Sequence, residues 1–180
     1  MPDSVQRRFA VIFDRDGVLN VDTGYAYDPA KLEWMPGARA AVARVNRAGV
    51  LALIATNQSG IGRGYYTEDQ MHGFHDEMIR QLEAEGARID RIYFAPHHED
   101  APEDHYRVAD HPDRKPNPGM LLRGLAEFGV EPDDAIMIGD KETDMEAARR
   151  AGVAGFLYRG GDLDAFVAER LKALLGTDVS

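Results

Sequence analysis

Residues 9–20 read FAVIFDRDGVLN, in which five apolar residues lead directly into two aspartates. An apolar run without alternation is typical of a strand that is buried on both faces of a parallel sheet. The run stops at Asp14 and Asp16, with Gly17 after them. In open α/β sheets, ligands bind outside the carboxyl ends of the strands. The stretch therefore predicts a buried strand whose tip carries two accessible carboxylates.

These two carboxylates have a chemical and a purely structural interpretation. One can act as a nucleophile that forms an acyl phosphate, the other as a general acid or base, and both can hold a hard cation. Asp and Gly are also ordinary turn residues, so the pair alone is compatible with a solvated turn. The rest of the chain favours the chemical interpretation.

The composition argues against several classes of protein. A chain of 180 residues is long enough for one buried core and predicts a single domain over 1–180. The formal net charge is −10 and no dense Lys/Arg cluster is present, which argues against nucleic acid or an anionic membrane as the main partner. There is no cysteine, so neither a disulfide nor a thiolate metal site can form.

The absence of cysteine fits a reducing compartment. The N-terminus is short and polar without the apolar core of a signal peptide, and no apolar run approaches transmembrane length. We therefore expect a cytoplasmic protein whose partner is a small molecule. We also expect a monomer.

The apolar runs predict an α/β fold. Runs suited to short buried strands lie at residues 9–13, 50–55, 92–95, 135–138 and 154–158. Helical patterns lie between and after them, at about 36–49, from Thr67 onward, and at about 118–128, 143–151 and 163–175. Thr67 and Gln70 have the spacing of a capping box. The alternation predicts a doubly wound, mostly parallel five-stranded sheet with helices on both faces.

Two segments lack a regular pattern. Residues 17–32 are long for a strand-to-helix turn, and residues 96–116 are rich in His, Asp, Glu and Pro. Irregular segments of this length inside a compact domain are more often functional than accidental. We expect a flap at about 17–32 and a long loop at about 96–116, which together form only a small cap.

Polar residues also follow two further strands and precede one helix. Thr56, in the run TNQSG, offers a hydroxyl beside backbone N–H groups that suit phosphate oxygens, although a plain Gly-rich loop would read the same way. Arg114 and Lys115 form a basic pair that suits an anion clamp. Asp140 is another acid at a strand tip, whereas Asp144 alone is best interpreted as a favourable charge in the first turn of a helix.

Together these tips supply a possible nucleophile, a hydroxyl, a cation and a second acid, as metal-assisted phosphoryl transfer requires. The combination resembles the haloacid dehalogenase (HAD)-like superfamily of phosphatases. Its four motifs match residues 14–18, Thr56, Lys115, and Asp140 with Asp144. The chain is more closely similar to the family of D-glycero-D-manno-heptose 1,7-bisphosphate 7-phosphatases. The resemblance extends over almost the whole chain. The matching stretches are residues 14–17 with Asn20, 22–25, 56–61, 63–64, 114–116 and 139–141.

The resemblance implies a Rossmann-like fold of haloacid dehalogenase type, a sugar phosphate substrate and Mg²⁺ as cofactor. It implies that Asp14 is the nucleophile and that Asp16 protonates the leaving oxygen and then activates water. Asp14, the backbone carbonyl of Asp16, and Asp140 would hold Mg²⁺, while Thr56 and Lys115 would steady the phosphoryl group. The implied substrate-binding residues are Asp22, Thr23, Gly24, Tyr25, Asn57, Gln58, Ser59, Arg114 and Lys141.

One departure concerns the loop ahead of Arg114, where members of this family usually carry a cysteine-rich zinc site. Ala95 stands at the first cysteine and His97 keeps the histidine position, while the later cysteine pair becomes roughly Ala109 and His111. A substitute site would draw on the remaining histidines and nearby aspartates, which zinc accepts. Charged loops are usually only solvated, so we expect no zinc. The histidines concerned are His97, His98, His105 and His111.

Three alternatives remain open at this stage. A histidinol phosphate phosphatase shares the four motifs, although the run SGIGRG after Gln58 is as in the heptose enzymes. A phospho-accepting receiver domain also places acids, a Thr and a Lys at strand tips, but takes its phosphate on the third strand, which here ends in Phe94, Ala95 and Pro96. An inactive phosphatase-like scaffold is disfavoured because no motif residue is missing.

Overall fold

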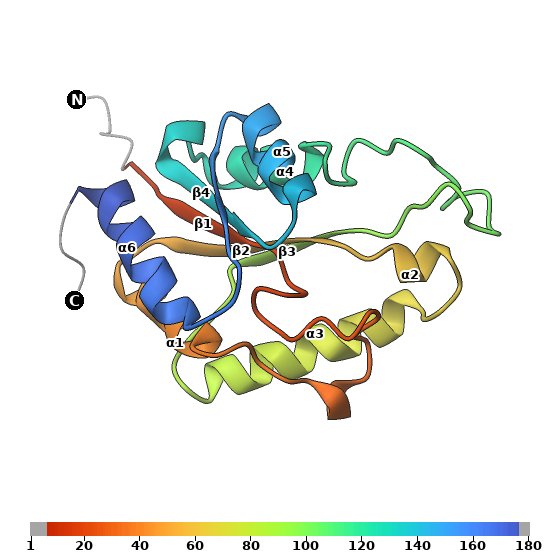
Figure 1. Ribbon diagram of the computed structural model, residues 1–180, viewed down its shortest axis with the longest axis horizontal. Helices are drawn as coiled ribbons and strands as arrows, with labels where there is room; N and C mark the ends of the chain where they lie inside the picture. The colour runs from red at the N-terminus through yellow and green to blue at the C-terminus, as the bar shows by residue number, and fades with distance from the viewer. Residues whose placement is uncertain (1–6, 177–180) are drawn as a thin grey trace.

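The computed structural model describes residues 7–176, and Figure 1 shows how their elements are arranged. One sheet contains five strands in the order β3-β2-β1-β4-β5, and every pair is parallel. The prediction of a doubly wound parallel sheet is therefore confirmed. The prediction that the polar N-terminus is not a signal peptide concerns residues 1–6, which lie outside the described residues. The strands are β1 (Ala10–Phe13), β2 (Leu51–Asn57), β3 (Arg91–Ala95), β4 (Ala135–Gly139) and β5 (Ala154–Leu157).

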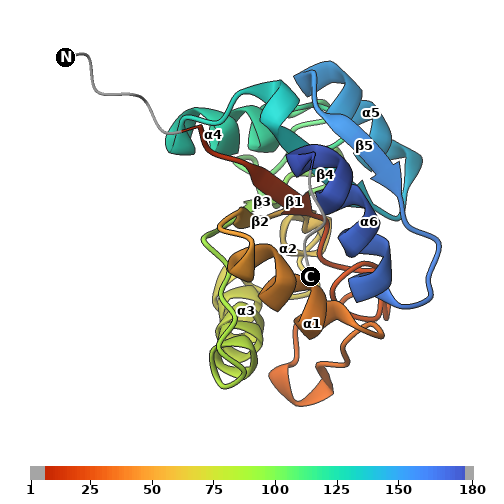
Figure 2. The ribbon, with the colours of Figure 1, turned by 90° about the vertical axis from the view of Figure 1, so that its left-hand side faces the viewer.

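Helices cover both faces of the sheet, as Figure 2 shows. One face packs on α1 (Ala38–Arg47), α3 (Glu68–Glu83) and α6 (Leu163–Leu175), and the other on α4 (Gly119–Phe128) and α5 (Glu142–Ala151). In β1, Val11 and Phe13 point to the first core, whereas Ala10 and Ile12 point to the second. Because successive side chains of a strand point to opposite faces, a strand covered on both sides has no polar position. This explains the unbroken apolar run.

The helix boundaries follow the signals in the sequence. Thr67 and Gln70 form the predicted capping box at the start of α3, and α6 covers the predicted range. Three one-turn pieces were not predicted, since elements this short show no hydrophobic period. They are α2 (Ser59–Gly62), η1 (Pro29–Lys31) and η2 (Pro132–Asp134).

The strand β5 differs from its prediction as a buried strand. Its residues Ala154 and Gly155 are exposed. The reason is its position, because β5 pairs with β4 alone and so forms one edge of the sheet. An apolar run cannot reveal by itself whether a strand has one neighbour or two.

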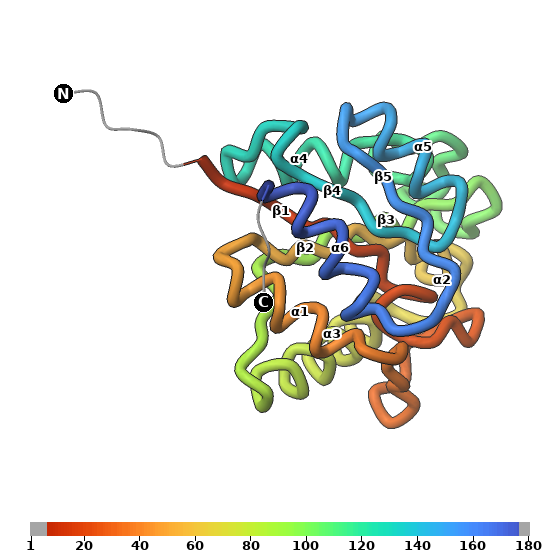
Figure 3. The backbone as a smooth tube through the Cα atoms, turned by 60° about the vertical axis from the view of Figure 1, so that its left-hand side comes forward, coloured from red at the N-terminus to blue at the C-terminus, as the bar shows by residue number. Residues whose placement is uncertain are grey.

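The helices α1 and α6 lie side by side although they are far apart in the sequence (Figure 3). Arg44 of α1 donates through Nε and Nη2 to the two carboxylate oxygens of Asp164, at 2.7 and 2.8 Å. This two-pronged ion pair fastens the last helix to the first. Among residues 7–176, no helix combines the length and the hydropathy needed to cross a lipid bilayer.

The strand order creates a crevice at the carboxyl ends of the strands. The chain leaves β1 toward β2 and β3 on one side and returns to β4 and β5 on the other. Such a switch point separates the loops that leave neighbouring strands and opens a binding site between them. The segment 17–32 leaves β1 at this edge and lies alongside α3 in Figure 1.

Candidate active site

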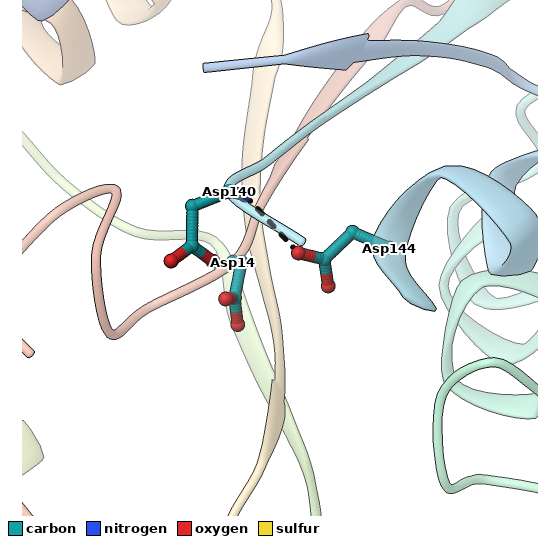
Figure 4. Close-up of side chains that lie close together, drawn as sticks. All are labelled: Asp14, Asp140 and Asp144. Carbon is teal, nitrogen blue, oxygen red and sulfur yellow. Dashed lines mark hydrogen bonds between the residues drawn. The ribbon is translucent and has the colours of Figure 1, made fainter. Parts of the chain in front are cut away.

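Three carboxylates converge at the ends of β1 and β4 (Figure 4). Asp14 follows β1, Asp140 follows β4, and Asp144 lies in the first turn of α5; each offers an oxygen within 4.8 Å of the others. The strand register accounts for this meeting, because Phe13 pairs with Ile138 and the Asp14 N–H donates to Ile138 O at 2.9 Å. Within residues 7–176, no other group of His, Cys, Asp and Glu side chains converges in this way.

Gly17 allows the chain to turn beside this cluster. Its φ is +85°, and a Cβ at this position would lie 2.3 Å from Asp140 Oδ2. Only glycine accepts such a φ readily and leaves that space open. The turn residue of the sequence motif is therefore needed for the packing of Asp140.

Lys115 is buried between two of the carboxylates. Its Nζ lies 2.9 Å from Asp14 Oδ1 and 2.6 Å from Asp144 Oδ1, and it donates to Ala55 O at 2.7 Å. Burial by itself lowers the pKa of Lys115, but Asp14 and Asp144 outweigh it and raise the pKa above its ordinary value. Lys115 therefore stays charged in the cluster.

The Asn57 side chain fixes Lys115 from behind. Asn57 Nδ2 donates to Lys115 O and Asn57 Oδ1 accepts from Lys115 N, both at 3.0 Å. This amide, predicted to bind substrate, also lines a pocket of about 400 Å³. Its two polar atoms are nonetheless used to position the backbone of Lys115.

The cluster fits a hard divalent cation. Three carboxylates lie close together, Lys115 pairs with only two of them, and Asp140 Oδ1 is buried without a hydrogen-bond partner. Burial raises the pKa of Asp14 to about 7, against the opposing effect of Lys115 and with a further increase from Asp144. Burial also raises the pKa of Asp140. Carboxylate oxygens are the ligands that Mg²⁺ prefers, and a cation here would offset the repulsion that disfavours the charged forms.

Asp16 lines one small chamber together with Asp14, Lys115 and Asp144, but its carboxylate has its own set of partners. Its Oδ1 accepts from Arg15 Nε, Arg15 Nη2 and Asn20 Nδ2, at 3.1, 2.9 and 2.9 Å. Its Oδ2 accepts from Arg15 Nη2 at 3.0 Å and from Gln58 Nε2 at 2.9 Å. The carboxylate is thus fixed by side chains from two loops.

Gln58 joins Asp16 to Thr56. Its Nε2 also donates to Thr56 Oγ1 at 2.8 Å, and its Oε1 accepts from the Tyr66 hydroxyl. All three side chains are buried, and burial raises the pKa of Tyr66. Because the amide orientation is set by Tyr66, the Gln58 N–H groups must face Asp16 and Thr56.

The site contains two adjacent cavities that share part of their lining. An inner chamber of about 70 Å³ touches Asp14, Lys115 and Asp144. An outer pocket of about 400 Å³ lies above it, within the usual range for ligand sites. Thr23 is exposed on the flap and does not line this pocket. The predicted residues that do are Asp16, Asp22, Gly24, Tyr25, Asn57, Gln58, Ser59, Arg114, Lys115 and Lys141.

Two cations reach the outer pocket from different loops. Lys141 Nζ lies 3.3 Å from Asp22 Oδ2, so the loop after β4 contacts the flap. Arg114 is partly buried and donates through Nη1 to His97 O at 3.0 Å. Burial lowers the pKa of Arg114, and the neighbouring charge of Arg63 lowers it further. The outer pocket therefore combines the cations Arg114, Lys115 and Lys141 with the carboxylates Asp16 and Asp22.

The sequence interpretation of Asp144 was incomplete. Its Oδ2 does accept from the backbone N–H groups of Asp140 and Lys141, at 3.1 and 3.0 Å, as a charge in the first helical turn would. Its Oδ1 also pairs with Lys115 inside the buried cluster. Spacing four residues after Asp140 was the available signal, and it was compatible with both roles.

Two further contributors, Arg15 and Tyr66, were not predicted. Both act through Asp16, directly or by way of Gln58. Neither is marked by a local pattern, since Tyr66 is an aromatic residue in a loop and Arg15 lies between two motif residues.

Known proteins resemble this chain in sequence and in structure. A family model described as HAD-hydrolase-like matches residues 112–174. A D-glycero-beta-D-manno-heptose-1,7-bisphosphate 7-phosphatase of Rhodopseudomonas palustris is 44% identical over 181 residues, which cover 100% of this chain and 99% of the relative.

Two solved structures share the fold and the sequence. A putative had-like phosphatase from Mesorhizobium loti has a TM-score of 0.86 at 33% identity and covers 93% of this chain and 88% of that one. The D,D-heptose 1,7-bisphosphate phosphatase from B. bronchiseptica, complexed with magnesium and phosphate, has a TM-score of 0.81 at 30% identity, with coverage of 92% and 99%. Because similarity at this level extends over the full chain, the protein belongs to the haloacid dehalogenase-like phosphatases, in the branch that contains the heptose bisphosphate 7-phosphatases.

Proposed function

We propose that this protein is a Mg²⁺-dependent phosphatase that removes the 7-phosphate of D-glycero-D-manno-heptose 1,7-bisphosphate. The observation that carries the proposal is the buried meeting of Asp14, Lys115, Asp140 and Asp144 below a cationic outer pocket. The Rhodopseudomonas palustris relative is named for this reaction, and the B. bronchiseptica structure was obtained with magnesium and phosphate.

In the first half of the reaction an oxygen of Asp14 attacks phosphorus and the bond to the sugar oxygen breaks. Asp16 gives its proton to that leaving oxygen, and Asp14 becomes an aspartyl-phosphate. Lys115 lines the inner chamber and Thr56 is buried at the end of β2, and we assign both to stabilising charge on the phosphoryl oxygens. Asp14 and Asp140 would hold Mg²⁺, which would reduce the repulsion between the Asp14 carboxylate and the dianionic phosphate.

In the second half Asp16 removes a proton from water. The water oxygen attacks phosphorus, the bond to Asp14 breaks, and inorganic phosphate leaves. The remaining part of the substrate occupies the outer pocket, where Arg114 and Lys141 supply positive charge for a second phosphate. The inner chamber is several times smaller than this pocket, which suits a phosphoryl group in one and a sugar in the other.

Steady-state kinetics on a panel of phosphate esters would test the proposal. The panel contains both anomers of the heptose bisphosphate, its monophosphate and histidinol phosphate, each measured with Mg²⁺ and with excess EDTA. We expect the highest kcat/KM with a heptose bisphosphate, and activity only with Mg²⁺. A preference for histidinol phosphate would reject the substrate, and full activity in EDTA would reject the metal-dependent mechanism.

A further inference from the structure

One guanidinium group joins the proposed acid–base residue to the flap. Arg15 is fully buried, and its Nη2 donates to both oxygens of Asp16 and to the backbone carbonyl of Ala26, the last at 2.7 Å. Ala26 lies directly after Tyr25, which lines the outer pocket. We infer that Arg15 is a positioning residue, which holds the carboxylate of Asp16 and the substrate-facing flap in one fixed relation. This inference rests on the proposed role of Asp16.

The guanidinium is itself anchored on α3. Its Nη1 lies 3.0 Å from His75 Nε2, and its Cζ lies 4.7 Å from the centroid of the Phe74 ring. A guanidinium carries donors only, so His75 Nε2 must accept and His75 must be neutral, with its proton on Nδ1. Burial, with further contributions from Arg15 and His72, lowers the pKa of His75 to about 3, which agrees with a neutral ring. A rigid helix thus sets where Arg15 lies.

The geometry of Arg15 distinguishes the two oxygens of Asp16. Oδ1 receives three donors, from Nε and Nη2 of Arg15 and from Asn20, whereas Oδ2 receives two. We assign the less occupied Oδ2 as the atom that exchanges a proton with the leaving oxygen and then with water. A lysine would neutralise the charge of Asp16, but its point charge cannot reproduce the planar fork that fixes both oxygens.

A positioning role of this kind makes a prediction that depends on the leaving group. A sugar alkoxide needs a proton as it departs, whereas p-nitrophenolate does not, because it is already a stable anion. When a reaction passes through an aspartyl-phosphate, kcat/KM reflects only the steps up to the departure of the leaving group. Misplacement of Asp16 should therefore lower kcat/KM for the sugar ester and spare that for the aryl ester.

The test uses Arg15→Lys and Arg15→Met, together with His75→Gln and His75→Leu, which keep and remove the acceptor for Arg15. The kcat/KM ratio of heptose bisphosphate to p-nitrophenyl phosphate should fall by about 10- to 100-fold in Arg15→Lys, within the usual contribution of general acid catalysis. It should fall further in Arg15→Met. His75→Leu should lower it more than His75→Gln.

Pre-steady-state measurements supply a second readout. With p-nitrophenyl phosphate, Arg15→Lys should release a burst of nitrophenolate equal to the enzyme concentration, because the aspartyl-phosphate forms but Asp16 no longer activates water efficiently. A loss of folded structure produces no such burst. Arg44→Met is the matched control, since it removes another two-pronged Arg–Asp pair, between α1 and α6, and should leave the ratio unchanged.

An unchanged ratio in folded Arg15→Lys and His75→Leu would overturn the inference, as would an equal loss for both esters without a burst. If the wild type prefers another alkyl phosphate, that ester replaces the heptose in the ratio, so the substrate assignment fails while the inference is still tested. A wild type inactive on both alkyl and aryl esters would overturn both.

Discussion

At the scale of single residues, Asp144 combines a structural and a chemical task in one carboxylate. Oδ2 accepts from two backbone N–H groups at the start of α5, and Oδ1 pairs with Lys115. The two tasks can be separated because an amide keeps an acceptor oxygen and loses the charge.

We therefore expect Asp144→Asn to lose most of its kcat and little stability. Asp144→Ala should lose kcat as well, and should also cost about 1 kcal/mol of unfolding free energy through the missing cap. Denaturant titration and Mg²⁺-dependent kinetics on the same preparations would measure both quantities. Wild-type kcat in Asp144→Asn would contradict a chemical role, and equal stability of the two variants would contradict the capping role.

His75 predicts a pH dependence of stability. Its pKa is lowered from 6.5 to about 3 in the folded protein, so between these values the unfolded chain binds a proton that the folded protein does not. The contribution of His75 is complete above pH 6.5 and is lost as the pH falls toward 3. The slope is about 1.4 kcal/mol per pH unit.

Denaturant unfolding of the wild type and His75→Gln at pH 6.5 to 5 would isolate this effect, because the titration of Asp14 is common to both proteins. The unfolding free energy of the wild type should fall more steeply with decreasing pH than that of His75→Gln, which has no titrating group at this position. Parallel curves for the two proteins would show that His75 takes up a proton in the fold.

The residues that the sequence could predict share one property. Asp14, Thr56, Lys115 and Asp140 all lie at the ends of apolar runs or the start of a helix, where a local pattern marks them. Arg15 is anchored by His75, 60 residues away, and Tyr66 reaches the site through Gln58, 8 residues away; no local pattern encodes such contacts.

At the scale of elements, the loop of residues 96–116 places Arg114 at the outer pocket. Tyr106 of this loop donates to Glu68 of α3 at 2.8 Å, and Asn117 Nδ2 donates to His111 O at 3.1 Å. His97 and His111 stack with ring centroids 3.6 Å apart and planes 7° apart. The loop is thus held by contacts within it and by a contact with α3.

For Arg114 we expect a role in recognising the second phosphate. Arg114→Ala should raise KM for a sugar bisphosphate by one to two powers of ten, since a hydrogen bond to a charged group contributes about 1.5–3 kcal/mol. KM for the corresponding monophosphate should change much less. Lys115→Ala is the comparison variant and should lower kcat for both substrates. Equal weakening of the two esters by Arg114→Ala would assign the distal phosphate to another cation.

The same loop predicts a low zinc content. Imidazole lone pairs lie in the ring plane, so the parallel rings of His97 and His111 do not aim their nitrogens at one shared ion. Elemental analysis of protein purified without a metal-affinity tag should give well below one zinc per chain. One tightly held zinc that is lost in His97→Ala and kept in His105→Ala would contradict this expectation.

At the scale of the whole molecule, the acid cluster sets function against stability. Asp14, Asp140 and Asp144 are held close together, and Lys115 pairs with only Asp14 and Asp144. Burial raises the pKa of Asp140, which means that its ionised form destabilises the fold in the absence of a cation. Strain of this kind is common where a site is built for ligand binding.

Asp140→Asn should therefore unfold at a higher temperature than the wild type in EDTA. Saturating Mg²⁺ at about 100 times its dissociation constant should stabilise the wild type by about 2.7 kcal/mol and the variant much less. Calorimetry of both proteins, in EDTA and in saturating Mg²⁺, would measure these differences in melting temperature. Asp133→Asn, an exposed substitution at the opposite end of β4, should behave as the wild type. A lower melting temperature of Asp140→Asn in EDTA would refute the trade-off.

The overall architecture could be predicted from the sequence, because each strand is a compact apolar run and each longer helix has a recognisable hydrophobic periodicity. The exposure of β5 could not be predicted, since it depends on which strands become neighbours in the sheet. The order of strands follows from long-range pairing that no single segment specifies.

The strand order has a consequence for biosynthesis. Residues 10–95 supply β1, β2 and β3, and β4 with β5 comes only after residue 134. The active site lies on the seam between these two halves, with the nucleophile on one side and Asp140 and Asp144 on the other. A nascent chain on the ribosome can thus complete its early half while the site is still absent. The active site is completed only late in synthesis, when β4 emerges and pairs with β1.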